Sequence, residues 1–162
     1  MKKLFSFLLI TSILFGIFTI PAAADSTNIT GQDNVEQTIR ALGIITGDEN
    51  GNMNLTSNVT RAEFCKMMVA ASGNSSISGS SAVSVFNDVK RTHWAAGYIK
   101  FAVNSGWVSG YVDGTFKPDN TITIEEAASA LLRMLGYSYE DLSGPYPDAQ
   151  LSKFNSLKLS SN

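Results

Sequence analysis

The sequence predicts a mainly α-helical protein built from a repeated helix–loop–helix unit, and three observations support this fold class. First, Thr60 and Glu63 stand three positions apart at the start of an apolar stretch with helical spacing, and so do Thr123 and Glu126. This T-x-x-E spacing is that of a capping box, in which two side chains satisfy free N–H groups at a helix start. Second, the two stretches belong to copies of one pattern. Third, an Asx-Gly pair precedes each of them, as expected for a tight turn with positive φ.

The first 24 residues have the form of a secretory signal peptide rather than of a folded element. Lys2 and Lys3 precede an almost unbroken apolar run over 4–20, and an A-x-A cleavage site follows at 22–24. We expect cleavage after Ala24, export from the cell, and no stable membrane span afterwards. A retained anchor helix is the alternative, because the run approaches the ~20 residues that cross a bilayer.

The charge balance of the exported chain excludes some classes of partner. The whole chain has 12 Lys and Arg against 14 Asp and Glu, and loss of Lys2 and Lys3 leaves 10 against 14, a net charge of −4. This gives no electrostatic footprint for nucleic acid or an anionic membrane surface. Cys65 is the only cysteine, so no internal disulfide is possible. We expect it to pack as a small apolar side chain rather than act as a nucleophile.

The first unit is assigned to residues 25–73. Asp33 and Glu36 have the D-x-x-E form of a capped helix start, and that helix is expected to end at Gly43. A short apolar step and a turn lead to the second helix, which starts after Thr60.

The second unit, residues 85–137, repeats the first at an offset of 63 positions. Six glycine and capping positions correspond: Gly43, Gly47, Gly51, Thr60, Glu63 and Gly73 recur as Gly106, Gly110, Gly114, Thr123, Glu126 and Gly136. The apolar positions also agree, with an i, i+3, i+4, i+7 face that we expect to be buried in both copies: Phe64, Met67, Met68 and Ala71, then Ala127, Ala130, Leu131 and Met134. Each copy is therefore expected to be a helical hairpin around a structured loop.

Between the copies, residues 74–84 are rich in Ser and Gly and predict a flexible connection. Within the second unit, Thr92 is a plausible N-cap. The helix that it would start has an expected buried face made of Ala95, Tyr98, Ile99 and Ala102.

A third unit begins at residues 138–162, because Tyr139 and Asp141 repeat the spacing of Phe86 and Asp88. Its first helix is expected over about 147–157, with Leu151 and Phe154 facing inward. The sequence stops before the loop and second helix of this unit, so we interpret the third unit as incomplete.

Arg61 is the one charge in the helix start at 60–64 that helix formation does not require. A cation in the first turn faces the positive end of the helix dipole, which costs about 0.3–1 kcal/mol at a surface. Free N–H groups, the dipole and a guanidinium together would form a receptor for an anion such as a carboxylate. The second unit keeps the cap but has Ile124 in place of the arginine. This contrast predicts that Arg61 is dispensable for folding and serves a ligand.

The ordered motifs of both units resemble the S-layer homology family. The pattern of that family is F-x-D, then h-W-A, then G-h-x-G-Y-x-D-G-T-F-x-P, then I-T-R-A-E. The second unit has F-N-D at 86–88, H-W-A at 93–95, G-W-V-S-G-Y-V-D-G-T-F-K-P at 106–118 and I-T at 122–123. The first unit has G-I-I-T-G-D at 43–48 and V-T-R-A-E at 59–63, without the F-x-D and W-A parts. The resemblance covers nearly all of 33–162.

The resemblance implies a helical module in which three repeats form a pseudo-threefold bundle with grooves between them. It also implies non-covalent binding of secondary cell wall polysaccharide, often through pyruvylated sugars, at the surface of Gram-positive-type bacteria. The expected partners are this wall polysaccharide, other S-layer proteins and further copies of the chain. No cofactor and no metal are expected, and the expected location is the cell wall.

Carried over by position, Arg61 is the anion-binding residue implied by the resemblance, with Thr60 and Glu63 shaping the helix start. Tyr111 and Lys117 lie beside the loop and are further candidates for glycan contact, with solvated surface as the alternative. Trp94 is also a candidate for sugar stacking, although a Trp beside an Ala-rich helix face is more often a core residue. Trp107 replaces Ile44 of the first unit, which favours packing.

The remaining motif positions are interpreted as structural. They are Asp88, Gly106, Gly110, Asp113, Gly114, Phe116, Pro118, Thr123 and Glu126.

Other function classes have less support in the sequence. An EF-hand loop from Asp48 would place Met53 where Gly is required and Val59 where Glu is required. A Ser-His-Asp enzyme would have to use His93, the only histidine, which is better explained as an exposed residue at a helix start. No enzyme activity is therefore predicted. A structural or self-assembling module of the cell surface, without glycan binding, remains the alternative.

Overall fold

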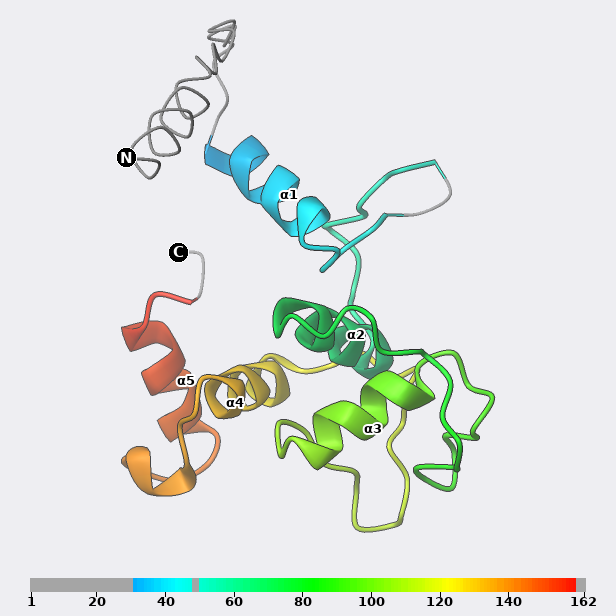
Figure 1. Ribbon diagram of the computed structural model, residues 1–162. Helices are drawn as coiled ribbons and strands as arrows, with labels where there is room; N and C mark the ends of the chain where they lie inside the picture. The colour runs from blue at the N-terminus through cyan, green and yellow to red at the C-terminus, as the bar shows by residue number, and fades with distance from the viewer. Residues whose placement is uncertain (1–30, 48–49, 160–162) are drawn as a thin grey trace, which may run out of the picture.

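The computed structural model describes residues 31–47 and 50–159, so the predicted signal peptide lies outside the described residues. The elements, in chain order, are α1 (Gly31–Ala41), α2 (Arg61–Ala71), α3 (Ala96–Asn104), α4 (Ile124–Met134), the 3-10 turn η1 (Tyr139–Asp141) and α5 (Asp148–Ser156) (Figure 1). No strand occurs in these two ranges, where an isolated antiparallel bridge joins Thr60 to Thr121. The mainly α prediction is confirmed.

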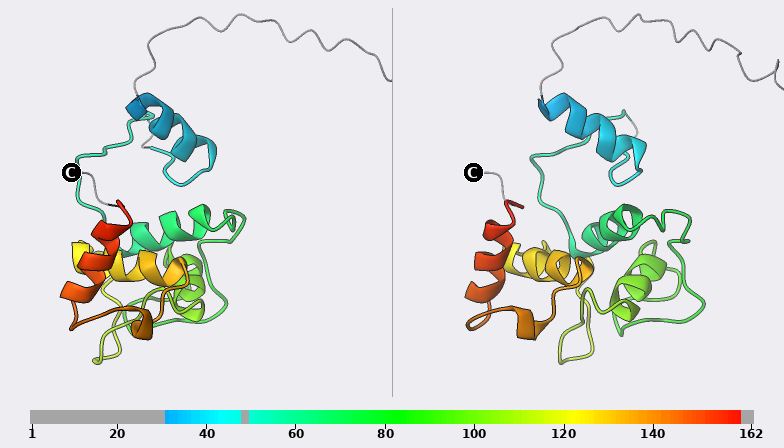
Figure 2. Two further views of the ribbon diagram at one scale, coloured as in Figure 1. Left: turned by 90° about the vertical axis from the view of Figure 1, so that its left-hand side faces the viewer. Right: turned by 60° about the vertical axis from the view of Figure 1, so that its left-hand side comes forward.

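The helices pack between consecutive units rather than within one unit. The extensive helix–helix contacts are those of α2 with α3 and of α4 with α5. The ribbon of α1 stands apart from the other helices in all three ribbon views (Figures 1 and 2). The first two units have the expected helix–loop–helix order, but the second helix of each is covered by the first helix of the next unit.

The main core lies between α2 and α3 and is built from small side chains around one aromatic ring. It contains Ala62, Cys65, Val89, Ala95, Ala96, Ile99, Ala102 and Phe116, all at most 1% exposed. Burial raises the pKa of the Cys65 thiol to about 12, against a smaller opposing effect of the Arg61 charge. The thiol is therefore neutral and packs as a small apolar group, as predicted.

Both capping boxes of the T-x-x-E type are confirmed. In α2 the Glu63 N–H donates to Thr60 Oγ1, and the Thr60 N–H donates to the Glu63 carboxylate. The box of Thr123 and Glu126 in α4 has the same two bonds.

Two other predicted caps are wrong. The α1 helix already begins at Gly31, so Asp33 lies inside its first turn rather than at the N-cap. The N-cap of α3 is Ala95 and not Thr92. The turn before α3 is closed instead by His93, whose Nδ1 accepts the Ala95 N–H at 3.1 Å.

The predicted buried faces of α2 and α4 are confirmed at Met68 and Ala130, which are 2% and 1% exposed, but the observed faces are otherwise rotated by about one residue. The α2 side chains with least exposure include Ala62, Cys65 and Val69, whereas Ala71 of the predicted face is exposed. In α4 the fully buried Ala128 stands next to the predicted Ala127, which is only half-buried. Apolar residues occur on most sides of α2, so periodicity alone does not select the correct face. The face predicted for α3 is confirmed, with Tyr98 half-buried and its other members buried.

Asp88 fixes the loop that joins α3 to α4 within the second unit. Its two carboxylate oxygens accept the N–H groups of Phe116 at 2.9 Å and Lys117 at 2.7 Å. Lys117 has a positive φ of 57°, so the loop turns back at this residue and carries Phe116 into the core. The ring of Phe116 lies 5.3 Å from that of Phe86, centroid to centroid. Gly110 is required here because a Cβ would lie 2.2 Å from a Phe86 ring carbon.

The Asx-Gly turn of the second unit is formed, with positive φ at Gly114 but not at Asp113. Asp113 instead accepts the N–H and hydroxyl groups of Thr115. Gly106 has the positive φ expected after the end of α3, and Pro118 is buried.

The Ser/Gly-rich connection is docked on α3 rather than loose. The Gly97 N–H donates to the Gly79 carbonyl at 2.6 Å, and the Ser81 N–H donates to the Arg91 carbonyl. A Cβ at Gly97 would lie 1.9 Å from the Ser78 carbonyl oxygen, so the approach depends on glycine. The predicted helix at 147–157 is confirmed as α5, with Phe154 6% exposed and Leu151 half-buried.

We expect Asp88→Ala to lower the free energy of unfolding by about 1–2 kcal/mol, because two backbone N–H groups lose a charged acceptor. Urea denaturation monitored by circular dichroism measures the change. Asp119→Ala on the same loop is the matched control, since this side chain is exposed and forms no ion pair in the described part of the chain. Equal stability of the two variants would contradict the role given to Asp88.

Candidate functional site

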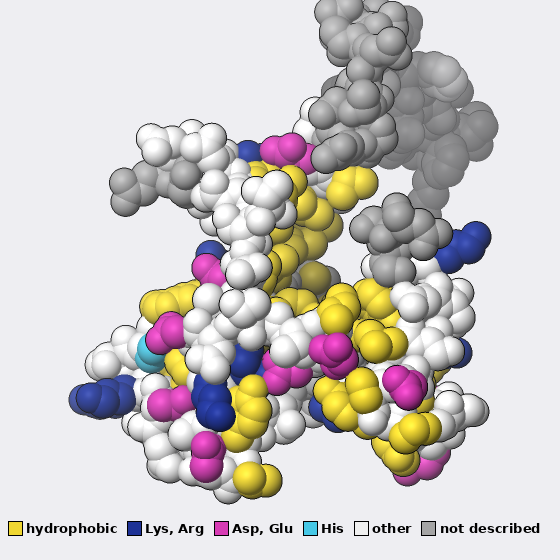
Figure 3. Space-filling view, turned by 180° about the vertical axis from the view of Figure 1, so that it is seen from behind, with side chains coloured by type: hydrophobic (Ala, Val, Ile, Leu, Met, Phe, Trp, Pro, Cys, Tyr) yellow, Lys and Arg dark blue, Asp and Glu magenta, His cyan; other side chains and the backbone are white. Residues whose placement is uncertain are grey.

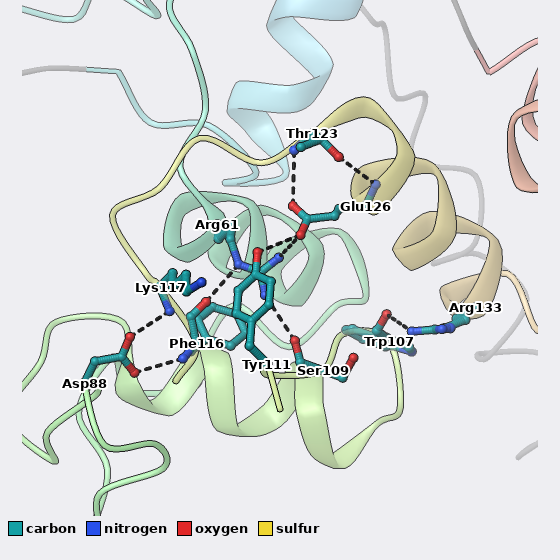
Figure 4. A network of polar contacts seen from close by, with 10 residues as sticks. All are labelled: Arg61, Asp88, Trp107, Ser109, Tyr111, Phe116, Lys117, Thr123, Glu126 and Arg133. Carbon is teal, nitrogen blue, oxygen red and sulfur yellow. Dashed lines mark hydrogen bonds and ion pairs between the residues drawn. The ribbon is translucent and has the colours of Figure 1, made fainter. Parts of the chain in front are cut away.

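The side chain of Arg61 is buried at the junction between the first and second units. It is 6% exposed. Nε donates to the Phe116 carbonyl at 2.9 Å, Nη2 donates to the Ser109 carbonyl at 3.1 Å, and Nη1 lies 2.8 Å from Oε1 of Glu126 (Figure 4). The guanidinium carbon also lies 4.9 Å from the ring centroid of Tyr111. One side chain of α2 thus holds the 109–116 loop and α4 together.

The backbone N–H groups at the start of α2 are also in use. Those of Arg61 and Ala62 donate to the carbonyls of Asn120 and Pro118, each at 2.9 Å. The third N–H is satisfied by Thr60 in the capping box. The prediction of free N–H groups for an anion at this helix start is therefore wrong, because the loop of the second unit occupies them.

Glu126 is the acidic partner at this junction and accepts three groups. Its carboxylate receives the Thr123 N–H at 3.2 Å, the Tyr111 hydroxyl at 2.9 Å and the Arg61 guanidinium. Burial alone would raise the pKa of Glu126, but these hydrogen bonds and the Arg61 charge hold it below its ordinary value of 4.5. The carboxylate is thus ionised near neutral pH and neutralises Arg61.

The prediction that Arg61 is dispensable for folding is wrong. Its guanidinium is buried and paired, and removing it would leave Glu126 partly buried without its counter-ion. The presence of Ile124 at the same position of the second unit has a structural explanation. Ile124 is 59% exposed and takes no part in such a junction within the described residues.

A groove of about 260 Å³ opens beside this ion pair. We call it the Arg61 groove; it is lined by Arg61, Trp107, Val108, Ser109, Gly110, Tyr111, Ile122, Glu126, Ser129, Arg133 and Tyr146. Seen from behind, the lower part of the molecule is hollowed between two halves, with acidic and basic side chains on the sides of the hollow (Figure 3). The groove therefore combines aromatic side chains with charge.

Arg133 gives the Arg61 groove its uncompensated charge. The charged lining residues are Arg61, Glu126 and Arg133, and the first two neutralise each other. Arg133 is exposed, and none of the ion pairs in the described ranges includes it. Its Nη1 donates to the Trp107 carbonyl at 3.5 Å, the outer limit of a hydrogen bond (Figure 4). This guanidinium is thus available to an anion.

The predicted glycan residues do not all meet at this groove. Arg61 and Tyr111 line it. Lys117 lies next to it, with its ammonium 4.2 Å from the Tyr111 ring centroid and 3.9 Å from the Asp113 carboxylate. Thr60 and Glu63 form the cap of α2 and are not among its lining residues.

Trp94 lies elsewhere. Its side chain is 48% exposed and stacks on His93 with 5.8 Å between ring centroids, so the interpretation of Trp94 as a core residue is wrong. Trp107 packs against the core as predicted, with its ring edge-on to Phe101 at 5.5 Å, and it also lines the Arg61 groove.

Sequence reasoning missed Ser129, Arg133 and Tyr146 as site residues. Arg133 offered one signal, because it is the basic residue inside an otherwise apolar run at 131–135. That signal also fits a cation favoured by the helix dipole in the last turn of α4. Ser129 and Tyr146 have no distinguishing pattern in the sequence.

Two features of the described residues bear on other functions. These residues contain no cluster of three or more His, Cys, Asp or Glu arranged to hold a metal ion. None of the helices described is long and apolar enough to cross a membrane.

Comparison with known proteins identifies the class as a domain of bacterial cell-surface proteins. The S-layer homology domain model matches residues 37–65 and 85–128. The middle cell wall protein of Brevibacillus brevis is 31% identical over 167 residues, which cover 98% of this chain and 16% of the relative. The cellulosome-anchoring protein of Acetivibrio thermocellus is 40% identical over 87 residues, 49% of this chain and 18% of the relative.

An endoglucanase of Bacillus sp. (strain KSM-635) is 29% identical over 170 residues, 96% of this chain and 17% of that enzyme. The chain spans between 16% and 18% of the length of these three relatives, and the match in each is to one part of a longer protein. This chain belongs to the S-layer homology domain family, as its motifs and its helical fold indicate.

We expect Arg61→Met to lower the free energy of unfolding by about 2–4 kcal/mol, because it removes one partner of a largely buried ion pair. Chemical denaturation measures the loss. Arg91→Met, at an exposed arginine of the loop before α3, is the matched control. The double variant Arg61→Met with Glu126→Gln should be less destabilised than the sum of the single changes. Additive changes would show that the pair is not coupled.

The Arg61–Glu126 pair should also give a defined pH dependence. Because the pKa of Glu126 is lower in the folded protein than its ordinary value of 4.5, its contribution is fully present above that value and is lost as pH falls through the lower, folded pKa. The stability difference between wild type and Glu126→Gln should therefore shrink over the acidic range below about pH 4.5. Urea titrations of both proteins across this range measure it, and a constant difference would contradict the assignment.

Proposed function

We propose that this chain attaches an exported bacterial protein to the cell wall non-covalently, by binding an anionic wall polysaccharide in the Arg61 groove. The observation that carries the proposal is the exposed guanidinium of Arg133, which has no ion-pair partner among the described residues, in a groove otherwise neutralised by the Arg61–Glu126 pair. Guanidinium groups pair with carboxylates in a bidentate geometry, and a wall glycan with acidic substituents, such as pyruvylated sugars, provides them.

The lining of the groove supports a sugar ligand. Trp107, Tyr111 and Tyr146 provide aromatic surface, and the last two are 37% and 56% exposed. Amphipathic rings of this kind suit a ligand that has both apolar and hydroxyl-bearing faces. Arg61 donates from Nε, Nη1 and Nη2 within the protein, which leaves further N–H groups of the same guanidinium for a ligand at the groove.

The names of two relatives agree with this function. One is a cell wall protein and the other a cellulosome-anchoring protein. In this proposal the chain itself is a non-enzymatic binding module that is located at the cell wall. Any catalytic activity would belong to other parts of a protein, as in the endoglucanase relative.

A self-assembling surface module is the second candidate, and one observation favours it. Val35 of α1 and Leu42, the residue that follows the end of α1, are 60% and 57% exposed, and α1 stands apart from the other helices (Figure 2). This role would require no polysaccharide. Sedimentation velocity of the protein over a range of concentrations tests it.

The test of wall attachment is co-sedimentation of the full chain with purified Brevibacillus brevis wall sacculi, before and after chemical extraction of the secondary polysaccharide. We expect the chain to bind intact sacculi and not extracted sacculi. Added soluble polysaccharide should compete with the intact sacculi and release the bound chain. Arg133→Gln should weaken binding about tenfold, since a charge-assisted hydrogen bond is lost. Arg91→Gln is the charge-matched control and should bind as wild type. Binding that survives extraction would refute the proposal.

A further inference from the structure

The Arg61 groove has a neighbour on the other side of Arg133. A second hollow of about 250 Å³ lies between α4, η1 and α5, and its walls include Ser129, Leu132, Arg133, Tyr137, Tyr139 and Gln150. We call it the α4–α5 hollow. Ser129 and Arg133 line both spaces, so these two side chains form the wall that the spaces share.

Two buried polar atoms point to a ligand here. Ser129 Oγ and Gln150 Oε1 are buried without a hydrogen-bond partner, and they are the two side-chain atoms of this kind in the described residues. Gln150 is only 6% exposed. A buried polar group without a partner costs about 1–3 kcal/mol, so buried polar groups in proteins are rarely left without a partner. Both atoms belong to residues that line the α4–α5 hollow.

The chemistry of Gln150 Oε1 and Ser129 Oγ indicates which hydrogen-bonding groups a ligand should offer them. The amide oxygen of Gln150 accepts a hydrogen bond and therefore requires a donor, such as a sugar hydroxyl. The Ser129 hydroxyl both donates and accepts. Arg133, the one charged residue in the lining of this hollow, only donates and favours an anionic group. Hydroxyl groups on one side and an acidic group at the shared wall are the features of an acidic saccharide.

The sizes of the two spaces favour joint use. Small-molecule sites usually measure about 300–1,000 Å³. Neither the groove at about 260 Å³ nor the hollow at about 250 Å³ reaches this range alone, whereas the two together fall within it. The exposed ring of Tyr139 at the hollow matches that of Tyr146 at the groove, at 66% and 56% exposed. Each space thus has its own aromatic side chain.

We propose that the α4–α5 hollow is a second saccharide subsite, so that the protein binds two neighbouring sugar residues of an acidic polysaccharide with the acidic group at Arg133. This inference rests on the proposed function and extends it beyond the Arg61 groove. Gln150 and Ser129 are the residues that bind hydroxyl groups of the second sugar. Affinity should therefore require an oligosaccharide that reaches both spaces.

The test uses Gln150→Leu and Ser129→Ala in the full chain. Because Gln150 Oε1 and Ser129 Oγ have no partner within the fold, replacing them with apolar groups should leave the thermal midpoint unchanged or raise it. Each variant should nevertheless bind Brevibacillus brevis wall polysaccharide about tenfold more weakly, measured by isothermal titration calorimetry. Gln37→Leu, the same change on the exposed side of α1, is the matched control for binding.

The outcomes separate this inference from the proposed function. If wild type binds, Arg133→Gln weakens binding and the two apolar variants bind as wild type, the second subsite is refuted and wall attachment stands. A clear drop in the thermal midpoint of Gln150→Leu would refute it too, because Gln150 would then be satisfied within the fold. If wild type does not bind the polysaccharide, both proposals fail. Size-fractionated fragments add a positive test: fragments of two or more sugars should bind more tightly than single sugars.

Discussion

The buried ion pair of Arg61 and Glu126 is the contact on which the rest of this structure depends. It joins α2 of the first unit to α4 of the second, and the same guanidinium holds the carbonyls of Ser109 and Phe116 in the intervening loop. A buried charge is costly unless it is paired and hydrogen-bonded, so the loop, the two helix starts and the ring of Phe116 must all be in place together. The Arg61 groove is a consequence, because its walls are the elements that this pair assembles.

The two arginines of the Arg61 groove, Arg61 and Arg133, have different roles because one is buried and the other is exposed. The guanidinium of Arg61 is neutralised by Glu126, whereas that of Arg133 lies at the end of α4 with one long hydrogen bond. The first charge positions the walls, and the second remains for a ligand. Burial explains the difference: an ion pair 6% and 25% exposed is protected from solvent screening, while an exposed guanidinium stays hydrated until a partner displaces the water.

Features that depend on nearby residues were predictable from the sequence, and those that depend on distant residues were not. The capping boxes at Thr60 and Thr123 act over three positions and were predicted correctly. The Arg61 side chain binds carbonyls 48 and 55 positions away, and no local pattern encodes such contacts. The repeat even misled in one respect. Ile124 suggested that Arg61 has no role in folding, but Arg61 is held by loop carbonyls whereas Ile124 is 59% exposed.

The order of helix packing has a mechanical consequence. Since α2 packs against α3 and α4 packs against α5, the chain has two separate interfaces between consecutive units. The interface between the first and second units is stabilised by the Arg61–Glu126 ion pair. It is also stabilised by backbone hydrogen bonds from the start of α2 to the loop before α4. Among the described residues no ion pair crosses the interface between α4 and α5, two helices whose buried side chains include Leu132 and Phe154. Under a pulling force the α4–α5 interface should therefore separate first, while the interface between the first and second units stays intact.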